Sequence, residues 1–225
     1  MSTDEDTIIN LTNHTYFNLD GGGNVLGQKL RIYASNYLEG NNETCPTGKI
    51  LPVDGTPMDF RTGKPLGRDL DTGFYQTTMA GGGFDHCYVL DRPRGASQSL
   101  CAWASSDKTG ISMKMYTTQP GIQLYTGNFL QNCPSPARAA SRMEKYGGFA
   151  LETQHFPCSP SHPEFLDDGA AGGQGLPRQH YAPLLHRPSV RPSCKLNISR
   201  SKAAVSLAEL PLCCFWRVLS MQLAD

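Results

Sequence analysis

The sequence predicts an all-β fold, in which residues 1–165 form an antiparallel β-sandwich and residues 166–225 form a tail of different character. Two observations support this class. Apolar and polar residues alternate along several short segments, as they do in strands with one buried face. The chain is also rich in turn-forming residues, with 23 glycines and 16 prolines, while long apolar helical patterns are few.

The expected strands follow one another along the first 165 residues. The segment 28–35, QKLRIYAS, alternates and places Leu30, Ile32 and Ala34 on one face. The segment 107–110, DKTG, predicts a turn, because Asp, Gly and Thr are common turn residues. Further strand candidates, two of which this turn joins, are 86–91 (HCYVLD), 99–106 (SLCAWASS), 111–118 (ISMKMYTT), 121–127 (GIQLYTG) and 149–154 (FALETQ). Such a series predicts antiparallel sheets packed as a sandwich.

The alternation ends near Leu166. The segment 167–180 is rich in glycine, and the segment 186–195 is rich in proline and arginine. Neither shows a strand or helix period, and the apolar segment 203–219 is interrupted by Pro211. This composition buries too little apolar surface to offset the entropy lost on ordering, so it predicts a disordered C-terminal tail.

Composition excludes several classes of partner. Lysine and arginine number 20, as do aspartate and glutamate, so the net charge is zero and neither nucleic acid nor an anionic membrane is expected to bind. The acidic N-terminus does not resemble a signal peptide, and no apolar run reaches the roughly 20 residues that span a bilayer. The eight cysteines form no C-x-x-C pair. We therefore expect reduced thiols in a cytoplasmic protein, with neither a disulfide framework nor a metal or other cofactor.

The segment 10–19, NLTNHTYFNL, contains the first candidate for chemistry. His14 lies among asparagines and threonines, with Tyr16 and Phe17 close behind it. A buried strand seldom contains so many amides, and a surface loop seldom contains adjacent aromatic residues. The mixture is typical of a half-buried wall, in which rings pack together and polar groups point at a ligand.

Three more polar residues lie on or beside predicted strands. Alternation in 149–154 places Glu152 on the face opposite Phe149 and Leu151, although a carboxylate on a sheet face is usually only solvated. Asp85 follows three glycines, and Gln123 shares a face with Tyr125. A carboxylate and an imidazole together suit acid and base catalysis near neutral pH. Amides and rings around them suit a neutral ligand rich in hydroxyls, such as a sugar.

Four motifs, in order, resemble the galactose mutarotase (aldose 1-epimerase) family: NLTNHTYFNL, GFDHCYVL, MYTTQPGIQLYTGNF and GFALETQHFP. The segment 51–61, LPVDGTPMDFR, resembles a stretch between the first two. The resemblance covers roughly residues 8–165. It implies the large antiparallel sandwich of that family, with a sugar-binding concave face, and an isomerase that interconverts the anomers of hexoses such as galactose and glucose.

The resemblance also implies residue roles. His14 is the expected general acid, which serves the ring oxygen, and Glu152 is the base that takes the proton of the anomeric hydroxyl. Asp85 and Gln123 are expected to hold sugar hydroxyls, and Tyr16 to flank the site. The two proton transfers reverse when the ring closes, so the reaction needs neither a cofactor nor a metal.

The sequence departs from the family pattern at both ends. The N-terminal half of the family, which carries a second histidine and an Asn-Arg pair, has no counterpart here, and the closing strand after Phe165 is also missing. We interpret the chain as a truncated member, whose turnover is expected to be far slower than that of a full-length relative. A catalytically weak or inactive carbohydrate-binding remnant, and a fragment that does not fold alone, are the alternatives.

Overall fold

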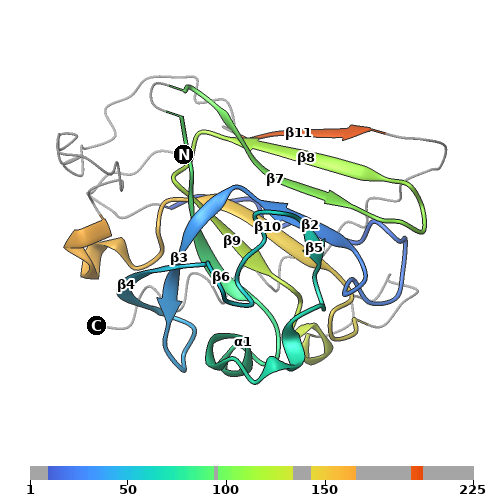
Figure 1. Cartoon of the computed structure of the whole chain (residues 1–225), viewed down its shortest axis with the longest axis horizontal. Helices are drawn as coiled ribbons and strands as arrows, with labels where there is room; N and C mark the ends of the chain where they lie inside the picture. Colours follow the sequence, from blue (N-terminus) through green and yellow to red (C-terminus); the bar gives the residue numbers. More distant parts are fainter. Residues whose placement is uncertain (1–9, 94–95, 134–142, 166–193, 200–225) are drawn as a thin grey trace.

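The structure, a computed structural model, describes residues 10–93, 96–133, 143–165 and 194–199. Within these residues the strands form two antiparallel sheets (Figure 1). The six-stranded sheet has the order β1-β10-β9-β6-β3-β4, and the five-stranded sheet has the order β11-β8-β7-β2-β5. The prediction of an all-β antiparallel sandwich is confirmed.

The strands of the six-stranded sheet are β1 (Tyr16–Phe17), β3 (Ala34–Gly40), β4 (Pro46–Pro52), β6 (Asp85–Leu90), β9 (Gly121–Tyr125) and β10 (Phe149–Gln154). Those of the five-stranded sheet are β2 (Lys29–Ile32), β5 (Lys64–Pro65), β7 (Ser99–Ser105), β8 (Ser112–Thr117) and β11 (Cys194–Ser199). The helical turns are η1 (Leu70–Thr72), α1 (Tyr75–Met79), η2 (Leu130–Asn132), η3 (Ser159–Ser161) and η4 (Pro163–Phe165). None of the helices in the described part of the chain is long and apolar enough to cross a membrane.

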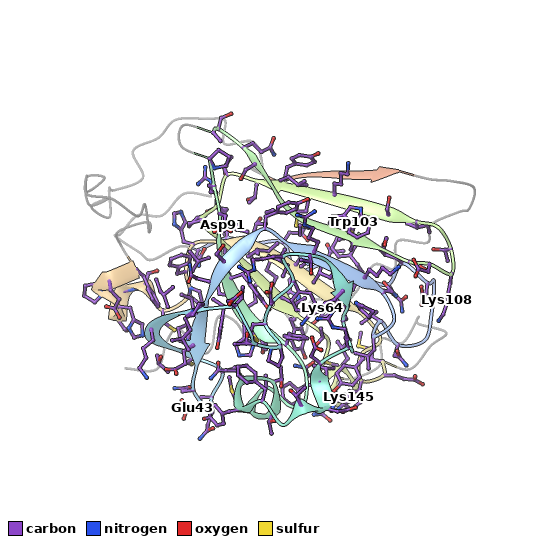
Figure 2. All side chains as sticks on the ribbon, viewed as in Figure 1. Glu43, Lys64, Asp91, Trp103, Lys108 and Lys145 are labelled. Atoms are coloured by element: carbon purple, nitrogen blue, oxygen red, sulfur yellow. The ribbon has the colours of Figure 1, made fainter. Side chains whose placement is uncertain are left out.

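One apolar core lies between the two sheets, where side chains crowd the space in Figure 2. Each sheet contributes every second residue of its strands, because successive side chains of a strand point to opposite faces. The core residues from the six-stranded sheet include Tyr88, Ile122, Leu124, Phe149 and Leu151, and those from the five-stranded sheet include Leu30, Ile32, Ala102, Ala104, Met113 and Met115. The alternate residues of the central strands β6, β9 and β10 therefore point to the opposite face of the sheet.

Alternation in the sequence placed the buried faces correctly. Leu30, Ile32 and Ala34 are all buried, as the pattern of residues 28–35 predicts. That segment contains a strand boundary, however, since β2 ends at Ile32 and β3 begins at Ala34 in the other sheet. A simple period of two cannot show such a change of sheet, because the alternation continues through it.

The tail expected over residues 166–225 contains one described segment. Residues Cys194–Ser199 form β11, which pairs antiparallel with β8 at the edge of the five-stranded sheet. Sequence analysis assigned no strand there, because proline- and arginine-rich sequence precedes a segment of only six residues, CKLNIS, in which apolar and polar residues alternate. The remainder of the predicted disordered tail lies outside the described residues. The division into a domain of residues 1–165 and a separate tail stays a prediction.

Candidate active site

The site residues lie on four neighbouring strands of the six-stranded sheet. Strand pairing places Gln123 of β9 opposite Glu152 of β10, and Tyr125 of β9 opposite Asp85 of β6. Tyr16 of β1 pairs with the residue two before Glu152. Because side chains alternate, these five residues share the face that points away from the core. We call this face, defined by Tyr16, Asp85, Gln123, Tyr125 and Glu152, the site face.

His14 lies two residues before β1 and approaches Glu152. Its Nε2 atom is 3.4 Å from Oε1 of Glu152, and the two side chains are 17% and 7% exposed. The pair is therefore shielded from bulk water on most sides, while His14 retains some access to solvent. The structure thus brings together the two residues that the sequence suggested as acid and base.

Burial shifts the acid–base properties of this pair in opposite directions. Desolvation, assisted by repulsion from the Asp85 carboxylate, raises the pKa of Glu152 to about 8. Desolvation by burial also lowers the pKa of His14. Between these two values the pair holds one proton in total, which resides on Glu152 in the free site. An acid and a base that exchange roles need one proton between them, and this pair holds one.

Asp85 and Gln123 form a second pair beside the first. The Gln123 amide donates a hydrogen bond from Nε2 to Oδ1 of Asp85, at 2.8 Å. Burial raises the pKa of Asp85 to about 6, although this hydrogen bond opposes the change. At neutral pH Asp85 is therefore mainly a carboxylate that can accept further hydrogen bonds. The other amide atom, Oε1 of Gln123, is buried without a hydrogen-bond partner in the described part of the chain.

Two tyrosine rings flank His14. Its imidazole lies 5.0 Å from the Tyr16 ring and 6.2 Å from the Tyr125 ring, and the two tyrosine rings are 6.1 Å apart. The Tyr125 hydroxyl accepts a hydrogen bond from the backbone N–H of Phe129, which fixes that ring. The expectation of a wall of rings around His14 is met, and these apolar surfaces suit the C–H faces of a sugar.

A buried amide shapes the glycine loop that leads to Asp85. Asn128 donates hydrogen bonds to the carbonyls of Ala80 and Phe84, at 2.6 and 3.0 Å, and accepts one from the Thr126 hydroxyl. A side chain on Gly83 would clash with the Asn128 amide, so the loop needs glycine there. Sequence analysis missed this role of Asn128. The local sequence after β9, Gly-Asn-Phe, contains no signal for it.

The neighbouring thiol and imidazole of β6 do not form a catalytic pair. His86 packs on the core side, with its Nε2 atom 3.1 Å from Oε1 of Gln76, and burial lowers its pKa to about 4. Cys87 faces the other way, and burial raises its pKa to about 12. Adjacent residues of a strand point to opposite faces, so these two side chains cannot act together. Within the described residues no group of three His, Cys, Asp or Glu side chains is placed to hold a metal ion.

The arrangement of these motifs is that of a known family. Residues 1–170 match the family model described as Aldose 1-epimerase. The chain belongs to the aldose 1-epimerase family. The resemblance that the four sequence motifs indicated is thus confirmed.

Two curated members of the family show how much of it the chain represents. The aldose 1-epimerase of Haemophilus influenzae is 38% identical over 177 residues, which cover 76% of this chain and 50% of that protein. The galactose mutarotase of Sus scrofa is 39% identical over 163 residues, which cover 72% and 45%. The chain spans about half the length of the curated relatives it matches.

Solved structures of the aldose 1-epimerase type have the same fold over this region. An aldose epimerase homologue from C. elegans superposes with a TM-score of 0.60 at 29% identity, covering 70% of this chain and 45% of that structure. A galactose 1-epimerase from Lactobacillus acidophilus superposes with a TM-score of 0.56 at 28% identity, covering 68% and 42%. The sandwich described here is therefore the fold of the family.

Proposed function

We propose that this chain carries the acid–base site of an aldose 1-epimerase and interconverts the α and β anomers of hexoses such as galactose and glucose. The observation that supports the proposal best is the 3.4 Å approach of the His14 imidazole to the Glu152 carboxyl on the site face. The activity belongs to hexose metabolism. We also propose a cytoplasmic location, because Cys45, Cys87, Cys101, Cys133 and Cys158 are free thiols.

The proposed reaction moves one proton at each end of a short relay. Glu152, as a carboxylate, takes the proton of the C1 hydroxyl, while His14, as an imidazolium, gives a proton to the ring oxygen. The C1–O5 bond breaks and leaves an open-chain aldehyde. Rotation about C1–C2 followed by reclosure, with the two roles exchanged, yields the other anomer. Proton count is conserved over the cycle, as microscopic reversibility requires.

The free site holds its one proton on Glu152 rather than on His14, because the pKa of Glu152 is raised and that of His14 is lowered. The catalytic distribution, imidazolium with carboxylate, therefore arises by transfer of that proton across the 3.4 Å gap or through a bound hydroxyl. Hydroxyls of a bound sugar would take the place of part of the water that burial removes from the His14–Glu152 pair. Both distributions contain one proton. A bound substrate therefore changes which residue carries the proton, but not the number of protons on the pair.

Sugar hydroxyls have suitable partners beside this pair. The Asp85 carboxylate can accept hydrogen bonds, and the unpaired Oε1 of Gln123 is a further acceptor. Tyr16 would flank the ring through its aromatic face. This set of acceptors and one aromatic wall favours a neutral hydroxylated ligand over an anion, which the nearby carboxyl groups would repel.

The proposal predicts a bell-shaped dependence of rate on pH. Below the lowered pKa of His14 the pair holds two protons and has no base, and above about pH 8 it holds none and has no acid. We expect the fastest catalysed mutarotation in the window above the lowered pKa of His14 and below about pH 8. The measurement is polarimetry of fresh α-D-galactose and α-D-glucose between pH 5 and 10, with the spontaneous rate subtracted. Binding of either sugar with no acceleration at any pH would instead indicate a carbohydrate-binding remnant.

A further inference from the structure

The segment that follows β10, residues 155–165, crosses the sheet on the same side as the site face. We call this segment the strap. Phe156 and Phe165 are buried, and their rings meet at 80° with centroids 5.5 Å apart. They pack against Cys87 of β6 and Leu38 of β3. The strap therefore runs from the end of the strand that carries Glu152 towards the opposite edge of the sheet, where its orange ribbon lies beside β4 in Figure 1.

The far end of the strap sits directly on the start of β4. Nε2 of His162 lies 3.2 Å from the carbonyl oxygen of Pro46, and its Nδ1 lies 3.0 Å from Oε1 of Glu164. A Cβ atom on Gly48 would come within 3.0 Å of both His162 and Glu164, and the φ of Gly48 is +95°. Only glycine permits so close an approach with that backbone conformation.

Two cysteines flank this junction. Cys45 immediately precedes Pro46, and Cys158 immediately precedes η3 with a left-handed backbone, φ 59°. Both side chains are partly exposed thiols. Burial and the nearby Cys45 thiol raise the pKa of Cys158. Cys87 and Cys101, in contrast, are buried. The contact thus joins two segments 113 residues apart in sequence (158 − 45) at a place that a small oxidant can reach.

We propose that Cys45 and Cys158 are a redox modification site, which a low-molecular-weight disulfide such as oxidised glutathione converts to a disulfide that fastens the strap to β4. This inference does not depend on the proposed function. It assigns a chemical role to two cysteines that the acid–base site does not use.

The reaction proceeds by thiol–disulfide exchange. Burial and the neighbouring thiol raise the pKa of Cys158, so the first attack falls to Cys45. The Cys45 thiolate attacks one sulfur of the small disulfide, breaks its S–S bond and releases one small thiol. The Cys158 thiolate then attacks the Cys45 sulfur of the mixed disulfide and releases the second. The two protein thiols lose two protons and two electrons, and the small disulfide is reduced to two thiols.

The crosslink has a measurable consequence for the fold. It removes conformations from the unfolded chain by closing a long loop, and it holds the end of β10 through the strap. We expect the oxidised chain to melt roughly 5 °C or more above the reduced chain, since the typical stabilisation by a disulfide shifts Tm by that order in a chain of this size.

The test uses the full chain treated with oxidised glutathione and digested without reduction. Mass spectrometry should find the Cys45 and Cys158 peptides joined, 2 Da below their summed mass, together with the rise in Tm. Cys45→Ser and Cys158→Ser should each abolish both effects, while Cys133→Ser, which changes another partly exposed thiol, should abolish neither. Mixed disulfides with glutathione alone, or a crosslink that joins other cysteines of the wild-type chain, would overturn the proposal whether or not the variants fold.

Discussion

Replacing Glu152 with glutamine should lower the catalysed mutarotation rate by 100-fold or more. Glutamine keeps the size of the side chain but has no carboxylate to take the C1 proton, and general base catalysis contributes about 100- to 10,000-fold. At neutral pH the free-site carboxyl is mostly protonated, because its pKa is about 8, so the neutral amide should fit the same space without loss of fold. The measurement is the polarimetric rate at pH 7.

A matched variant separates this effect from a general loss of negative charge. Glu43→Gln removes an exposed carboxylate near the turn between β3 and β4, at the lower edge of the molecule in Figure 2. This variant should retain the wild-type rate. A clear wild-type rate that Glu152→Gln leaves unchanged would contradict the assignment of Glu152 as the base.

The same substitution should make the fold less sensitive to alkaline pH. The folded-state pKa of Glu152 is about 8, whereas the ordinary value is 4.5. Between these values the folded chain binds more protons than the unfolded chain, so the free energy of unfolding falls as pH rises. Each pKa unit corresponds to about 1.4 kcal/mol, so the step from pH 6 to pH 9 should cost the wild-type chain about 3 kcal/mol through this group. Glutamine cannot ionise and should not lose that stability.

Urea unfolding followed by circular dichroism at pH 6 and pH 9 measures this difference. Asp85 and His14 also face Glu152, but both are kept in the variant, so the comparison isolates the Glu152 contribution. Glu43→Gln serves again as the control and should lose stability with pH as the wild type does. An equal loss of stability in wild type and Glu152→Gln would show that the carboxyl titrates near its ordinary pKa.

Much of the fold could be predicted from the sequence because apolar residues recur with a period of two. Ile122 and Leu124 alternate with Gln123 and Tyr125, and the structure buries the first pair in the core. Alternation alone could not assign strands to sheets. The neighbours β9 and β10 are separated in sequence, and their pairing depends on side-chain packing across both sheets.

The site was only partly predictable. The sequence could place Glu152 on the polar face of its strand, but it could not show that this face is covered, nor that the carboxyl is 7% exposed. That burial, which raises the pKa of Glu152, arises from His14 and its surroundings about 140 residues away in sequence. The buried amide of Asn128 was missed for the same reason, because its partners Ala80 and Phe84 belong to a distant loop.

Joint action of His14 and Glu152 on one sugar is the central claim, and the mutarotation rate of the double variant tests it most directly. His14→Asn and Glu152→Gln should each lower the rate by about 100-fold or more. Because an acid and a base that serve one step fail together, the double variant should be little slower than the slower single variant. His155→Asn, which changes an exposed histidine beside β10, should have no effect. Losses that multiply in the double variant, or a wild-type rate in either single variant, would contradict the claim.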